Sequence, residues 1–150
     1  MKYIEKDNII FNLKIEDKEN AIKYLANVFN KNGYLNDLSK YIEEVNKREE
    51  TMSTSIGKGI AIPHGKTNAV NKPGIVVAKL SKPFIWDEVE NEEISIIIMF
   101  AADEGEGNTH LKMLADVSMK LMDDDFVEKL KTSKNKEELY KLLRGEQWKS

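Results

Sequence analysis

Residues 94–100, Ile-Ser-Ile-Ile-Ile-Met-Phe, constrain the fold more than any other segment of the chain. They are apolar and β-branched almost throughout, which is typical of a strand buried on both faces. A second run of this kind, Ile-Val-Val-Ala-Lys-Leu, occupies residues 75–80. Because a sheet built from such strands needs an apolar cover on each face, we expect helices on both sides of it.

Helical periodicity in the flanking segments supplies this cover. A short strand over 9–15 leads to Asp17, a candidate N-cap, and the helix after it should end at Gly33. Its apolar positions are Ala21, Ile22, Leu25, Val28 and Phe29. A helix further along is predicted to carry this apolar stripe: Leu111, Leu114, Ala115, Ser118, Leu121 and Met122. Two more helices, near 123–131 and 135–144, should complete a mixed α/β fold.

Length and composition fit one domain over residues 1–150. A chain of 150 residues can bury a core without disulfide or metal staples, and 41% hydrophobic with 33% charged residues is ordinary for a globular protein. A net charge of -3 with interspersed signs gives no footprint for a nucleic acid or an anionic bilayer. No signal-like segment and no apolar run of about 20 residues is present, so we expect a cytoplasmic protein without membrane insertion.

Cysteine is absent, so nucleophilic chemistry must come from other side chains. His64 lies in Gly59-Ile-Ala-Ile-Pro-His-Gly65, within a Ser-, Thr- and Gly-rich loop that should contain a brief strand. Pro63 favours an extended Ile62, which holds His64 at a strand end, and Gly65 allows close approach of a backbone or partner. A neutral imidazole whose other nitrogen is hydrogen-bonded can accept a phosphoryl group. From these residues alone, a surface or capping histidine is the simpler interpretation.

His110 lies where a helix should begin, after the longest strand and a glycine-containing loop, with Asn108 or Thr109 as candidate N-cap. Strand, loop and helix start form an arrangement that collects anions, because unpaired N–H groups and the positive end of the helix dipole point into the crevice. The dipole should also keep the His110 ring neutral. An exposed first-turn histidine is the alternative.

Arg48 is one of two arginines among many lysines. A helix from about Leu38 has the buried stripe Tyr41, Ile42 and Val45, and its spacing continues onto Arg48 and Glu49. A guanidinium at that position needs an anionic or carbonyl partner, and its planar geometry suits phosphate. An ion pair with Glu49 or Glu44 is the alternative. Hydroxyl groups nearby are candidate phosphate donors, with none singled out: Thr51, Ser53, Thr54 and Ser55.

Several other chemistries lack their sequence signatures. Neither Gly-x-x-x-x-Gly-Lys-Ser/Thr nor Gly-x-Gly-x-x-Gly occurs, which argues against nucleotide hydrolysis and dinucleotide binding. Both histidines with Asp103 or Asp116 are chemically able to bind zinc, but no His-x-x-x-His pair supports a zinc hydrolase. The acidic run 88–93 is interpreted as a solvated turn.

Three segments together resemble the fructose/mannitol class of phosphotransferase system IIA domains. They are Ser55-Ile-Gly-Lys-Gly-Ile-Ala-Ile-Pro-His-Gly65, Arg48-Glu49 upstream and Thr109-His-Leu111 downstream. The resemblance continues through Lys-Pro-Phe-Ile-Trp-Asp, residues 82–87, expected as a turn after the 75–80 strand, and Glu-Glu-Leu-Tyr near the C-terminus.

This resemblance implies an α/β domain with a mixed sheet of about five strands and helices on both faces. It also implies a phosphotransferase in which His64 is phosphorylated on Nε2 as a tele-phosphohistidine, His110 is a second active-site histidine and Arg48 contacts the phosphate. The implied donor is the histidine-containing phosphocarrier protein, and the implied acceptor is a cysteine of a IIB component. No metal or organic cofactor is implied.

The phosphohistidine must be shielded from water, so we expect a shallow apolar surface around His64 that includes Ile60, Ile62 and Met52. A regulatory, nitrogen-type IIA protein that binds target proteins according to its phosphorylation state shares the acceptor chemistry and is the alternative function. The sugar is not encoded in a phosphoryl carrier, which need never touch it.

Overall fold

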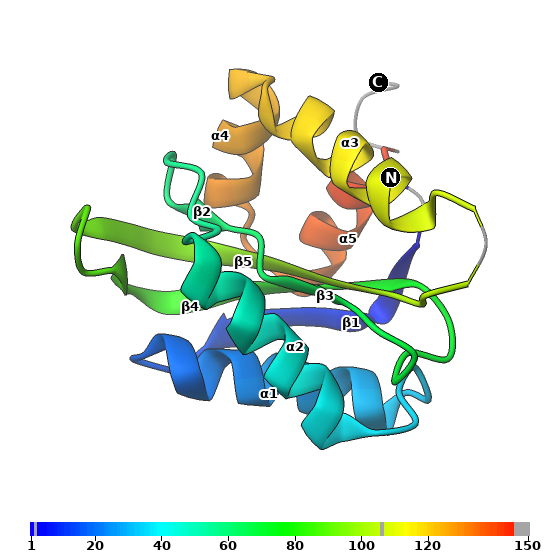
Figure 1. The fold of residues 1–150 in the computed structure, drawn as a ribbon. Coiled ribbons are helices and arrows are strands. Elements are labelled where there is room, and N and C mark those ends of the chain that lie inside the picture. Colours follow the sequence, from blue (N-terminus) through cyan, green and yellow to red (C-terminus); the bar gives the residue numbers. More distant parts are fainter. Residues whose placement is uncertain (2, 106, 146–150) are drawn as a thin grey trace.

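The computed structural model describes residues 1, 3–105 and 107–145. Within them the chain forms a mixed five-stranded sheet with the spatial order β1-β4-β5-β2, and β3 also pairs with β5 (Figure 1). The strands are β1 (Ile4–Leu13), β2 (Ile60–Ala61), β3 (His64–Lys66), β4 (Gly74–Asp87) and β5 (Glu92–Ala102). The antiparallel β4–β5 hairpin forms the centre, and β1, β2 and β3 run parallel to their neighbours.

Helices cover both faces of this sheet, as the double-sided apolar strand predicts (Figure 1). On one face lie α1 (Lys18–Lys31) and α2 (Leu38–Thr51). On the other lie α3 (Thr109–Leu121), α4 (Asp124–Thr132) and α5 (Lys136–Arg144). No helix of the described residues combines the length and apolar character needed to cross a membrane.

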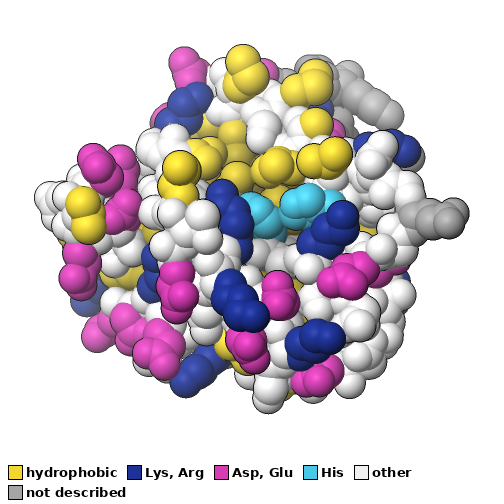
Figure 2. Space-filling model, viewed as in Figure 1, with side chains coloured by type: hydrophobic (Ala, Val, Ile, Leu, Met, Phe, Trp, Pro, Cys, Tyr) yellow, Lys and Arg dark blue, Asp and Glu magenta, His cyan; other side chains and the backbone are white. Residues whose placement is uncertain are grey.

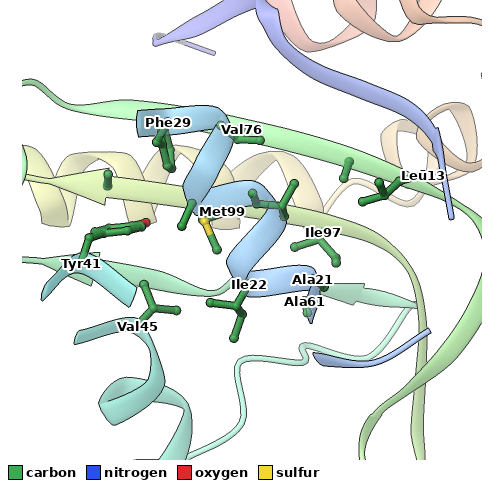
Figure 3. Close-up of a cluster of buried hydrophobic side chains, with 14 of the residues drawn as sticks. Leu13, Ala21, Ile22, Phe29, Tyr41, Val45, Ala61, Val76, Ile97 and Met99 are labelled. Atoms are coloured by element: carbon green, nitrogen blue, oxygen red, sulfur yellow. The ribbon is translucent and has the colours of Figure 1, made fainter. Parts of the chain in front are cut away.

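Strand β5 connects the two sides of the core because its side chains alternate between them. Ile97 and Met99 pack into the same buried cluster as residues of α1 and α2, and Figure 3 shows Met99 in the middle of this cluster. Phe100 and its neighbours on the other side pack with α3, α4 and α5. The prediction that residues 94–100 are buried on both faces is therefore confirmed.

The first helix also agrees with its prediction. Asp17 accepts a hydrogen bond from the Asn20 backbone N–H, and the helix ends at Lys31, two residues before Gly33 at a φ of 85°. The strand before it is longer at its start than the predicted 9–15 and ends two residues earlier. Residues 5–7 are charged and exposed, so side-chain periodicity gives no strand signal there, whereas Ile4 before them is buried and pairs with Ile75 of β4.

The prediction of a turn at residues 82–87 is wrong. These residues continue β4 and pair with β5, with Phe84 opposite Ile94, and the turn follows them at 88–91. Pro83 has no N–H to donate, which favours a turn, but the β4–β5 register is interrupted at this point and accommodates it.

The predicted apolar stripe of the helix after His110 is also wrong in part. Helix α3 buries Met113, Val117 and Leu121, whereas Leu111 and Met122 are 60% and 77% exposed. The helix has apolar residues on two faces, and periodicity does not distinguish the face that meets the sheet. The second face remains exposed to solvent.

Candidate active site

His64 stands at the start of β3 rather than at the end of a single brief strand. Its segment pairs in parallel with β5, so that His64 lies opposite Phe100, and the Phe100 N–H donates to the Pro63 carbonyl at 3.2 Å. The imidazole is stacked on the Phe100 ring, with centroids 4.6 Å apart and planes 3° from parallel. His64 is 6% exposed, which leaves only an edge of the ring accessible.

One hydrogen bond determines which ring nitrogen of His64 is free. Nδ1 lies 2.8 Å from the Ile62 carbonyl oxygen, and a carbonyl oxygen can only accept. The proton of the neutral ring is therefore on Nδ1, and Nε2 carries the lone pair. Within the described part of the chain no hydrogen bond engages Nε2, so its lone pair is available to an electrophile.

Gly65 brings β3 close to α2. A Cβ at this position would lie 3.2 Å from both Tyr41 Cε1 and Val45 Cγ2. The Tyr41 hydroxyl in turn donates to the Phe100 carbonyl at 2.9 Å, which joins α2 to the central strand. The close approach expected at Gly65 is thus made by helix α2, and it brings the end of that helix beside His64.

Arg48 lies at the edge of the buried stripe of α2, not within it as predicted. Glu49 takes the buried position at 7% exposure, while Arg48 is half-buried and its Nη1 donates to the Met52 carbonyl at 2.7 Å. Neither alternative ion pair, to Glu49 or to Glu44, is formed among the described residues. Glu49 is buried in preference to Arg48 because it has partners in other segments of the fold, which helical spacing cannot reveal.

His110 is the second residue of α3, and its ring centroid lies 5.3 Å from that of His64. Asn108 occupies the N-cap position, but its side chain makes no capping bond within the described residues. The Nδ1 atom of His110 is buried and lacks a hydrogen-bond partner in the same part of the chain. The start of α3 therefore presents polar groups that are not used internally.

A hollow of about 310 Å³ joins these groups. It is lined by Glu44, Lys47, Arg48, Thr51, His64, Gly65, Lys66 and His110. Figure 2 shows the two histidines at the centre of one face, bordered by lysine and arginine side chains and by an apolar area. The three residues singled out from the sequence thus meet in one place.

The hydroxyl groups before His64 have different positions. Thr51 lines the hollow and donates to the Lys47 carbonyl, and Thr54 is bonded to the Glu49 carboxylate. Ser53 Oγ accepts from the Ser55 N–H, and the Ser55 hydroxyl is buried without a partner among the described residues. Of the four, Thr51 is the one that borders the hollow.

Both histidines are held in their neutral form. Burial lowers the pKa of His64; the Ile62 hydrogen bond acts in the opposite direction, and the positive charge of Arg48 acts with burial. Burial also lowers the pKa of His110, with further contributions from Lys66 and Arg48. A neutral imidazole with a defined tautomer, set among cations, can attack an electrophilic group that carries negative charge, as a phosphoryl group does.

Lys66 was not singled out from the sequence, although it lines the hollow. Strand alternation offers a signal for it, because residues 64 and 66 of an extended segment project to the same side.

The apolar surface expected around His64 is formed only in part. Met52 is exposed as expected, but Ile60 and Ile62 are buried in the core. No group of three metal-ligating side chains occurs in the described ranges.

Comparison with known proteins agrees with a site of this class. Residues 2–145 match the family described as phosphoenolpyruvate-dependent sugar phosphotransferase system, EIIA 2. The fructose-specific EIIABC component of Bacillus subtilis is 33% identical over 140 residues, covering 93% of this chain and 22% of that protein. The nitrogen regulatory protein of Bradyrhizobium diazoefficiens is 30% identical over 131 residues, covering 87% of this chain and 85% of that protein.

A solved structure shows the same fold. Enzyme IIAMTL from Escherichia coli, in complex with phosphorylated enzyme IIBMTL, superposes with a TM-score of 0.78 at 26% identity, covering 93% of this chain and 95% of that one. The chain belongs to the EIIA type-2 family, whose members are phosphotransferase components that carry phosphoryl groups through histidine. It spans about a fifth of the length of the first curated relatives that it matches.

Proposed function

We propose that residues 1–150 form the IIA domain of a sugar phosphotransferase system, with His64 as the phosphoryl acceptor. The donor is the histidine-containing phosphocarrier protein, the acceptor is a cysteine of a IIB component, and the sugar is of the fructose/mannitol kind. The observation that carries this proposal is the Nδ1 hydrogen bond of His64 to the Ile62 carbonyl, which leaves Nε2 as the free nucleophile.

In the proposed step, Nε2 of His64 attacks phosphorus as the bond between phosphorus and the donor imidazole breaks. The electron pair of that bond returns to the donor nitrogen, so the reaction exchanges one N–P bond for another. Catalysis then rests on positioning and charge stabilisation. Arg48 and Lys66 supply positive charge at the hollow, and His110 with the uncapped start of α3 supplies hydrogen-bond donors.

An exposed apolar surface beside the hollow supports docking of protein partners. It includes Met52 and Leu111, and Ile56, Met119 and Met122 are further exposed apolar residues of the segments that follow these two. Met52 accepts the hydrogen bond from Arg48, and Leu111 follows His110 directly, so this surface borders the site. A partner that covers it would exclude water from the phosphorylated histidine, which limits hydrolysis.

The test is phosphorylation by purified enzyme I and phosphocarrier protein with labelled phosphoenolpyruvate. Wild-type protein should acquire label that is stable to base and labile to acid, as expected for phosphohistidine. His64→Ala should acquire none, and His110→Gln should acquire it more slowly. Equal labelling of His64→Ala and wild type would overturn the assignment, and complete loss in His110→Gln alone would reverse the two roles.

A regulatory function is the second candidate. It is supported by the nitrogen regulatory protein of Bradyrhizobium diazoefficiens, which is nearly as similar to this chain as the fructose component of Bacillus subtilis. Both functions use the same acceptor chemistry. Mixing labelled protein with a purified fructose- or mannitol-type IIB component decides between them, because a transport relay passes its label to the IIB cysteine and a regulator does not.

A further inference from the structure

Glu49 is a buried carboxylate outside the hollow, and it gathers donors from three other segments. Trp86 Nε1 donates to its Oε1 at 3.1 Å, and Lys18 Nζ forms an ion pair with the same oxygen at 3.1 Å. The Thr54 N–H donates to Oε1 at 3.3 Å, and the Thr54 hydroxyl donates to Oε2. A carboxylate is stable in such a place because its charge is paired and hydrogen-bonded.

These contacts continue toward the active site through the backbone. The Thr54 carbonyl accepts from the Ile62 N–H at 3.0 Å, and the Ile62 carbonyl accepts from His64 Nδ1 at 2.8 Å. Between Thr54 and Ile62 the chain closes on itself through a bond from the Ile56 N–H to the Ile60 carbonyl at 3.0 Å. Glu49 is therefore joined to the His64 ring by an unbroken series of contacts through Thr54 and Ile62.

We propose that Glu49 is a positioning residue of the phosphoryl relay, which acts through Thr54 and Ile62 to keep the proton of His64 on Nδ1. The proposal rests on the proposed function of His64. Without the anchor at Thr54, the Ile62 carbonyl is free to move away from Nδ1. The neutral ring then also populates the tautomer with its proton on Nε2, which has no lone pair on that atom and cannot attack.

Glu49 also affects the position of Arg48 relative to His64, because it follows Arg48 on α2. Its bonds to Thr54 tie the end of this helix to the segment that leads into His64. Arg48 and His64 therefore lie on two segments that are bonded to each other, which fixes the distance between the guanidinium and the imidazole, as an active site requires.

Two substitutions at Glu49 separate hydrogen bonding from charge. Glu49→Gln keeps an acceptor oxygen for Thr54 and Trp86, and its amide can donate to the Thr54 hydroxyl, which is able to accept. Glu49→Ala removes every contact. Trp86→Phe is the matched control, because it removes a donor on the other side of Glu49 and leaves both bonds to Thr54 in place.

The readout that a merely structural role would not move is the His64 tautomer. Long-range ¹H–¹⁵N spectra distinguish the protonated ring nitrogen from the unprotonated one. We expect wild type, Glu49→Gln and Trp86→Phe to show Nδ1–H alone and Glu49→Ala to show a mixture. The phosphorylation rate of Glu49→Ala should fall about tenfold or more, by analogy with the loss typical for residues that orient a metal-binding histidine.

A Glu49→Ala protein that keeps the Nδ1–H tautomer would overturn the proposal, as would an equal change of tautomer in Trp86→Phe. If Glu49→Ala does not fold, Thr54→Val takes its place, since it removes the hydroxyl bond alone and should shift the tautomer by a smaller amount. The spectra need no phosphoryl donor. They therefore test the positioning role even if the labelling experiment shows that His64 is not the acceptor.

Discussion

Replacing Gly65 by alanine tests the contact that brings β3 to α2. The added Cβ would lie 3.2 Å from Tyr41 Cε1 and from Val45 Cγ2, closer than ordinary van der Waals contact. Both neighbours are fully buried, and Tyr41 is held by its hydrogen bond to the Phe100 carbonyl, so neither can move away freely. The backbone of Gly65 is not in the left-handed region, so steric crowding alone sets the native-state cost.

The expected magnitude follows from two opposing effects. Overpacking of this kind costs about 1–3 kcal/mol. Replacing glycine by alanine in a compatible backbone recovers about 0.4–1 kcal/mol, because the unfolded chain loses conformational freedom. The difference lies between about 0 and 2.6 kcal/mol, so Gly65→Ala should lower the free energy of unfolding by about 1.3 kcal/mol at the middle of the two ranges. It should also slow phosphorylation, because β3 is pushed away from the helix that carries Arg48.

Urea denaturation measures the first effect as a lower midpoint at an unchanged slope. Val45→Ala provides the decisive partner, because it removes the Cγ2 atom that the new Cβ meets. The double variant should be more stable than the sum of the two single effects allows, by about 0.5 kcal/mol or more. Strict additivity, or a Gly65→Ala protein more stable than wild type, would refute the reasoning.

Three further results are expected. Because burial lowers the pKa of His64 in the folded protein, the unfolded chain binds more protons than the folded one at acidic pH. The free energy of unfolding should therefore fall as the pH drops below about 6.5. Urea midpoints measured at several pH values should show a smaller fall in His64→Gln. Lys79 Nζ donates to the Lys131 and Ser133 carbonyls at the end of α4, so Lys79→Met should cost about 1–3 kcal/mol in the same assay, and no change would contradict a capping role. Leu111→Ser should slow transfer from the phosphocarrier protein without loss of stability. Val89 on the β4–β5 turn is 91% exposed, and Val89→Ser should leave the transfer rate unchanged. Equal rates in the two variants would argue against docking beside His110.

The parts of the fold that were predictable are those in which one apolar pattern has one structural solution. Residues 94–100 leave little choice but a strand covered on both faces, and the helix after Asp17 has a capping residue and a single apolar stripe. The proximity of His64, His110 and Arg48 could be predicted from the family resemblance of the three segments that contain them. Local sequence patterns could not predict it, because the three residues lie on three separate elements.

The parts that were not predictable depend on tertiary partners. Arg48 and Glu49 both continue the spacing of their helix, and the donors Trp86, Lys18 and Thr54 decide in favour of Glu49. In α3 two apolar faces compete, and one of them remains outside the core. In each case the spacing along the helix allows two arrangements, and residues outside that helix decide between them.

The stacking of His64 on Phe100 provides a spectroscopic probe of the site without any label. Protons of an imidazole that is stacked on a nearly parallel phenyl ring, with centroids 4.6 Å apart, experience its ring current and resonate upfield of their usual positions. A partner that tilts or lifts the imidazole by even a small amount would move these resonances back. The carbon-bound protons of His64 can thus report on docking and on phosphorylation in the unmodified protein, one residue at a time.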